Sequence, residues 1–120
     1  MKDIYNDTLQ VVEALKAARL QVVQLSTQLA DLEYHLGVVA ARIERGLIKK
    51  VGDEKKLGPS LDSRERIFVL ARDADQDYVA LRSRRDSLQE QVETAKVEVK
   101  YLQDKMAVMM AAAQADQSAA

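Results

Sequence analysis

Apolar side chains recur every three or four residues from the start of the chain to about residue 43. The pattern runs without a miss from Leu15 to Ile43, and it extends back to Ile4 with Thr8 as its one polar member. This spacing is typical of a helix that packs one face against another helix, as in a coiled coil. These positions form the first seam: Ile4, Thr8, Val11, Leu15, Ala18, Val22, Leu25, Leu29, Leu32, Leu36, Val39 and Ile43. The first seam predicts a helix over about residues 3–48, with Gly52 as its stop.

A change of composition separates this helix from the next periodic segment. Residues 52–60 have the sequence GDEKKLGPS, which contains two glycines and the only proline of the chain. This composition predicts a turn between two helices. Either Ser60 or Asp62 is suited to cap the next helix, and Asp62 with Glu65 has the spacing of a capping box.

The three-and-four spacing resumes at Ile67 and continues to Ala113. The second seam has Arg85 as its only polar member and consists of Ile67, Ala71, Ala74, Tyr78, Leu81, Arg85, Leu88, Val92, Ala95, Val99, Leu102, Met106, Met109 and Ala113. The three aspartates within residues 73–77 have low helix propensity and good capping ability, which favours a kink or a restart there. Because the seam is uninterrupted, we expect one continuous helix over about residues 61–113, followed by a frayed tail at 114–120.

Two helices of comparable length with a short connection predict an all-α fold. The expected architecture is a single domain over residues 1–120, folded as a long antiparallel two-helix coiled-coil hairpin. Further apolar residues lie off both seams: Leu9, Val12, Val23, Val38, Phe68, Val69, Leu70, Val97, Val108 and Met110. We therefore expect a homo-oligomer, with two hairpins packed into a four-helix bundle, while another protein partner would satisfy the same surface. The expected oligomer seam consists of Leu25, Leu29, Leu32, Leu36, Leu81, Arg85, Leu88 and Val92.

Arg85 stands out because a cation in an apolar row needs a polar partner or a route to water. Polar seam residues often fix the register or the oligomeric state of a coiled coil. An exposed position, reached along the flexible stem of the side chain, is the alternative.

Composition narrows the class of protein. The 120 residues are 48% hydrophobic and 31% charged, which fits a folded helical protein rather than a disordered one. The chain has no cysteine, no apolar run of about 20 residues and no apolar core in its first ten residues. We therefore expect a cytoplasmic protein without a membrane segment, and a formal net charge of −1 argues against a globally basic protein.

Candidate metal and catalytic residues do not form a recognisable motif. Asp73, Asp75 and Asp77 resemble the opening of a calcium loop, but Tyr78 and Arg84 occupy the positions of its glycine and bidentate glutamate. The single histidine, His35, lies four residues after Asp31 and is expected to form a surface polar pair with it. We therefore predict no metal, no cofactor and no enzymatic activity.

Charge is concentrated at the predicted turn. Residues 42–66 contain eight cations and five acids, a local excess of three positive charges. Phosphate groups of a nucleic acid could bind such a tip, although a solvated turn explains the same charges. The residues expected to contact phosphates are Arg45, Lys49, Lys50, Lys55, Lys56 and Arg64.

The segment from Ala41 to Tyr78 carries one resemblance. Its stretches ARIERGLIKKVGDEKKLG, Ser63-Arg64-Glu65-Arg66 and Asp75-Gln76-Asp77-Tyr78 resemble small helical-hairpin proteins of phages and other mobile elements. The resemblance covers about a third of the chain and implies an accessory protein in DNA recombination or replication.

Two functions follow as predictions. The first is a structural or adaptor protein that assembles through coiled-coil packing, and the second is a nucleic-acid accessory protein that uses the basic tip. Binding to phosphates should weaken steeply as salt rises, whereas apolar helix packing should tolerate salt.

Overall fold

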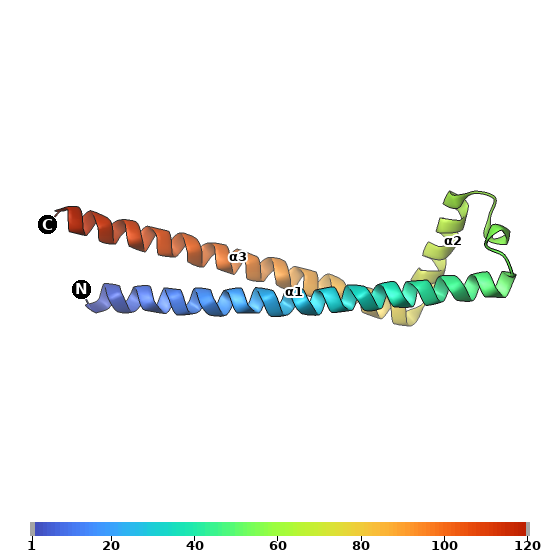
Figure 1. Ribbon diagram of the computed structural model, residues 1–120, viewed down its shortest axis with the longest axis horizontal. Helices are drawn as coiled ribbons and strands as arrows, with labels where there is room; N and C mark the ends of the chain where they lie inside the picture. Colours follow the sequence, from blue (N-terminus) through green and yellow to red (C-terminus); the bar gives the residue numbers. More distant parts are fainter. Residues whose placement is uncertain (1, 120) are drawn as a thin grey trace. The chain divides into compact units, whose positions relative to one another are not determined.

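Helices account for nearly all of residues 2–119, the part of the chain that the computed structural model describes. In chain order they are α1 (Lys2–Val51), a short 3-10 helix η1 (Glu54–Leu57), α2 (Leu61–Ala74) and α3 (Gln76–Ala119), as Figure 1 shows. Residues 2–119 contain no β-strand, so the prediction of an all-α fold is confirmed.

α1 is longer at both ends than the predicted range of about 3–48. Asp3 lies in its first turn and Lys49 and Lys50 lie in its last turn, where their charges interact favourably with the helix dipole. Gly46 does not interrupt the helix. Gly52 follows the last residue with a φ of +88°, and its N–H donates to the carbonyl of Ile48 at 2.8 Å. A left-handed backbone at this position ends the helix, and glycine adopts it without a Cβ penalty.

The connection between α1 and α2 is more ordered than a plain turn. Asp53 caps η1 by accepting a hydrogen bond from the Lys55 N–H at 3.0 Å. The predicted capping box of Asp62 and Glu65 is wrong. Ser60, the other predicted cap, is confirmed as the cap of α2, because Ser60 Oγ accepts from the Ser63 N–H at 3.2 Å while Ser63 Oγ accepts from the Ser60 N–H at 3.1 Å.

The second predicted helix is not continuous. Asp75 has extended backbone angles (φ −86°, ψ 118°) and separates α2 from α3. Its carboxylate accepts a hydrogen bond from the Tyr78 N–H at 2.8 Å, so it caps the start of α3. The helix breaks at Asp75 because an aspartate has low propensity for a helix interior, and here it satisfies a free N–H at the start of α3.

α3 also continues past the expected end. It reaches Ala119, although residues 114–120 were expected to fray; residue 120 lies outside the described part of the chain. Residues 111–119 include five alanines, the residue with the highest helix propensity. The high helix propensity of these alanines therefore explains why α3 continues beyond Ala113, the last residue of the second seam.

Contacts divide the chain into two units. Unit 1 comprises the chain up to Thr27 and from Gln89 onward, which are the first half of α1 and the second half of α3. Within it the two helices run side by side in opposite directions (Figure 1). Its core contains Leu15, Ala18 and Leu102, against which Val99 and Met106 pack. The prediction of one domain over residues 1–120 stays a prediction.

Unit 2 comprises Gln28–Leu88 and contains the second half of α1, η1, α2 and the start of α3. Leu57 of η1 and Phe68 of α2 are buried, and these two elements contact each other. Phe68 was expected to be available for a second layer of helices, and this expectation is wrong. Phe68 is buried within a single chain, in a helix that contacts η1.

Candidate functional site

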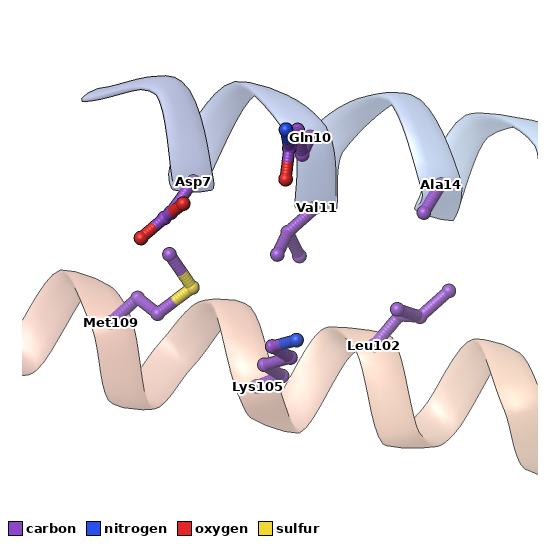
Figure 2. A pocket seen from close by; sticks show the side chains of 7 residues that line it. All are labelled: Asp7, Gln10, Val11, Ala14, Leu102, Lys105 and Met109. Atoms are coloured by element: carbon purple, nitrogen blue, oxygen red, sulfur yellow. The ribbon is translucent and has the colours of Figure 1, made fainter. Parts of the chain in front are cut away.

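A groove lies between α1 and α3 in unit 1 (Figure 2). Its volume is about 620 Å³. From α1, Val11 points toward the facing helix, and from α3 the side chains of Leu102 and Met109 point back toward α1. The residues that line it are Asp7, Gln10, Val11, Ala14, Leu102, Lys105 and Met109. The groove therefore combines an apolar floor with one acid and one amine from opposite helices, an arrangement suited to holding apolar side chains.

A second row of apolar residues follows one flank of α1 in unit 1. These residues form the α1 flank and are all exposed: Tyr5 (70%), Leu9 (47%), Val12 (41%), Leu20 (58%) and Val23 (61%). Lys16 completes the three-and-four spacing between Val12 and Leu20. At 100° per residue this row lies roughly a third of a turn from the first seam, so it does not face the partner helix α3. Leu9, Val12 and Val23 were predicted, whereas Tyr5 and Leu20 were missed although they share the same spacing.

A hollow of about 290 Å³ lies beside the α1 flank. Val22, Val23 and Val99 form its apolar part, and the cations Arg19 and Lys96 also line it. Lys96 additionally lies 3.6 Å from Glu93 of its own helix. An apolar surface next to two cations suits an aromatic ring, whose face attracts positive charge.

The residues of the predicted oligomer seam divide between the two units. Leu25 and Val92 belong to unit 1, and the other members belong to unit 2. Val92, Leu32 and Leu36 are buried within one chain, whereas the others are half-buried. The prediction that this seam joins two copies stays a prediction. Arg85, which is half-buried, pairs with the neighbouring Asp86 at 3.0 Å and has thereby a carboxylate partner on its own helix.

The six predicted phosphate contacts all lie in unit 2, but their side chains have different roles. Arg64 is half-buried and its Nε–H donates to the Gly58 carbonyl at 3.0 Å, which holds the end of the turn. Arg45 is exposed and its Nε–H donates to the Ala41 carbonyl at 3.4 Å. Four exposed lysines follow one another from the last turn of α1 into η1: Lys49, Lys50, Lys55 and Lys56. None of these lysines forms an ion pair with another residue of the described chain.

Ion pairs hold the elements of unit 2 around the break at Asp75. Arg72 of α2 contacts Glu44 of α1 at 3.4 Å and Glu65 at 2.9 Å. On the other side of the break, Arg82 contacts Asp73 at 2.7 Å and lies 5.7 Å from the centre of the Tyr78 ring. The hydrogen bond from Arg82 to Asp73 raises the pKa of this guanidinium above its usual value.

Two of the three aspartates that resembled the opening of a calcium loop form contacts at the ends of the helices, and Asp77 lies in the first turn of α3. Asp73 binds Arg82, and Asp75 caps α3. His35 lies 3.7 Å from Asp31, which confirms the predicted surface pair. Across residues 2–119 the side chains of His, Asp and Glu form no group of three suited to a metal ion.

No helix in the described part of the chain is both long and apolar enough to span a membrane. Comparisons with protein-family models, curated proteins and solved structures found no match to this chain.

Proposed function

We propose that this protein is a non-enzymatic structural or adaptor protein that assembles through helix packing. In this proposal the chain is an antiparallel coiled-coil hairpin, and two copies pack into a four-helix bundle. The observation that carries the proposal is the α1 flank, which is exposed while the neighbouring seam residues Val11, Leu15 and Ala18 are buried. An α-helix with two apolar rows needs two partners, and α3 supplies only one of them.

The size of the apolar surface supports an assembly role. Removing a large apolar side chain from water contributes about 1.5–3 kcal/mol when its burial is complete. The α1 flank carries five such side chains, so even partial burial in both copies would favour association. Isolated apolar residues on a surface are ordinary, whereas several large apolar residues gathered along one face of a helix mark an interaction site.

Light scattering tests this proposal. The native chain should have twice the mass of the 13.4 kDa chain, and the dimer fraction should fall on dilution. The variant Leu9→Gln/Leu20→Gln should be monomeric and retain its helical circular dichroism. The matched control Ala17→Gln/Gln21→Ala changes two exposed residues on another face of α1 and should remain dimeric. A native chain that is monomeric at every concentration would contradict the proposal.

A second candidate function is nucleic-acid binding through the basic tip. The observation in its favour is the set of four exposed lysines at residues 49, 50, 55 and 56, which have no ion-pair partner within the described chain. Four phosphate contacts would give a logarithmic salt slope of roughly −3.6 on duplex DNA. Affinity would then fall roughly a hundredfold between 50 and 200 mM salt.

Fluorescence anisotropy with labelled single- and double-stranded DNA and RNA tests this second function. Changing the four tip lysines to glutamine should abolish binding and its salt dependence. A control with Lys16, Lys96, Lys100 and Lys105 changed to glutamine removes the same charge from unit 1 and should bind as the native chain does. Equal loss in both variants, or no binding by the native chain at low salt, would count against the tip as a binding site.

A further inference from the structure

We infer that the α1 flank pairs with the α1 flank of a second copy in antiparallel orientation, about a two-fold axis near residue 14, and that Tyr5 of each copy enters the hollow of the other. This inference rests on the proposed self-assembly and specifies its surface and orientation. It follows from the register of the flank, from its charges and from the position of the hollow.

The spacing of the flank is suited to antiparallel pairing with itself. When the pair is centred near residue 14, Tyr5 lies opposite Val23 of the second copy, and Leu9 lies beside its Leu20. Val12 lies opposite Lys16, whose aliphatic stem can cover the valine. Tyr5, Leu9, Leu20 and Val23 of each copy therefore each face an apolar residue of the other copy.

Charge favours the antiparallel orientation over the parallel one. In a parallel pair in register, Lys16 would face Lys16 of the second copy, and like charges in an interface are destabilising. In the antiparallel pair the two Lys16 residues are offset by about 6 Å along the helix axis, and each is offset by only about 1.5 Å from Glu13 of the second copy, compared with about 4.5 Å in the parallel pair. The two-fold axis therefore gives two opposite-charge pairs that flank the apolar contacts.

The hollow supplies a matching site for Tyr5. It is lined by Val23, the residue opposite Tyr5 in this register, and by Val22, Val99 and the cations Arg19 and Lys96. Tyr5 is 70% exposed in the single chain, so its ring is free to enter such a site. The ring would contact the three valines, and its negative face would attract the two cations.

The outer face of α3 is a weaker match for self-pairing. Val97, Tyr101 and Val108 are exposed there, but they are only three large apolar residues over a similar length. Asp104 lies in the middle of this row and binds Lys100 at 3.0 Å. Pairing through this face would bury an ion pair where the α1 flank offers apolar contacts.

Disulfide trapping distinguishes the two orientations, because the native chain contains no cysteine. Variants Tyr5→Cys and Val23→Cys are oxidised alone and as an equimolar mixture, and the covalent dimers are identified by mass. In the antiparallel pair, two copies of residue 5 are separated by roughly 27 Å along the helix axis. A disulfide needs Cβ atoms about 3.8 Å apart, so only the mixture should form covalent dimers.

Several outcomes would overturn the inference. Rapid trapping of either variant alone would indicate a parallel pair. No trapping in the mixture, at a protein concentration where light scattering shows that the reduced mixture is dimeric, would place the interface elsewhere and leave the proposed self-assembly intact. A monomeric native chain would refute the proposed function itself. Variants that retain native circular dichroism are required for each comparison.

Substitution of Tyr5 provides a second measurement that needs no cross-link. Tyr5→Ala should weaken the dimer roughly a hundredfold, because each dimer loses two aromatic anchors. Tyr5→Phe keeps the ring and should bind within roughly threefold of the native chain. Equal dimer affinity in native chain and Tyr5→Ala would exclude the hollow as the site of the ring.

Discussion

Replacing Leu102 with alanine tests whether the two helices of unit 1 share a core. Leu102 is 7% exposed and packs with Leu15 and Ala18 of α1. The substitution removes the equivalent of three methylene groups, which corresponds to about 2.4 kcal/mol of lost transfer free energy. Leu102 also lines the open groove, so water can fill the space and the additional cavity cost should be small. We therefore expect the free energy of unfolding to fall by about 2–3 kcal/mol.

Urea unfolding followed by circular dichroism measures this change. With an m-value of about 1.5–2 kcal/mol per molar urea, the midpoint should fall by about 1–2 M. All variants are compared at one protein concentration, because association of the native state raises the apparent stability. The control Val97→Ala changes a 69% exposed residue of the same helix and should alter stability by less than about 0.5 kcal/mol.

A double-mutant cycle then tests the contact itself. Leu15→Ala and Leu102→Ala affect one core, so their combined effect should differ from the sum of the single effects by about 0.5–1.5 kcal/mol. Leu15→Ala combined with Val97→Ala should be additive. Additivity in both cycles, or a Leu102→Ala variant as stable as Val97→Ala, would refute the packing of α1 against α3 in unit 1.

Three further predictions concern the ends of helices and use the same urea assay. Gly52→Ala should lower the free energy of unfolding by about 1–2 kcal/mol, because φ is +88° at this position. Gly46→Ala inside α1 should raise it by about 0.5–1 kcal/mol, because an added Cβ meets no atom there. Changes of the same sign in both variants would contradict these two expectations. Ser60→Ala should cost about 1 kcal/mol and Asp62→Ala less than about 0.5 kcal/mol, and the reverse order would restore the capping box predicted from the sequence. Asp75→Ala should cost about 1 kcal/mol through the lost cap of α3, and an unchanged midpoint would refute that role.

The apolar spacing alone predicted which face of each long helix is buried. Every buried residue of α1 and α3 in the described chain belongs to one of the two seams: Val11, Leu15, Ala18, Leu32, Leu36, Val92, Ala95 and Leu102. This success has a physical reason, because burial follows the apolar face whatever the partner helix is. The same pattern does not contain the identity of the partner. The spacing therefore cannot predict whether the oligomer seam joins two copies.

The helix boundaries near residues 60 and 75 depended on competition between neighbouring polar groups. Ser60 and Asp62 are both good caps, and a difference of a few tenths of a kcal/mol decides between them. Glu65 would have completed the predicted capping box, but it binds Arg72 seven residues later. The aspartates within residues 73–77 indicated a possible break, but the seam keeps its spacing on both sides of Asp75, and this regular spacing favoured one continuous helix. The spacing of apolar residues identifies the buried face of a helix, but it does not reveal a cap that interrupts the helix at a single residue.

The ion pairs of unit 2 affect how a salt-dependent binding experiment must be interpreted. Arg72 links α2 to Glu44 of α1, and salt weakens this link as it weakens phosphate contacts. The tip lysines lie on α1 and η1. A salt effect on DNA binding by the native chain can therefore come either from the phosphate contacts of these lysines or from the ion pair between Arg72 and Glu44. Arg72→Gln removes the ion pair and keeps the four lysines. If the lysines bind phosphates directly, this variant should retain the native salt slope even if its affinity changes, because the slope counts phosphate contacts. A slope that flattens in Arg72→Gln would instead assign the salt dependence to the ion pairs that position α2.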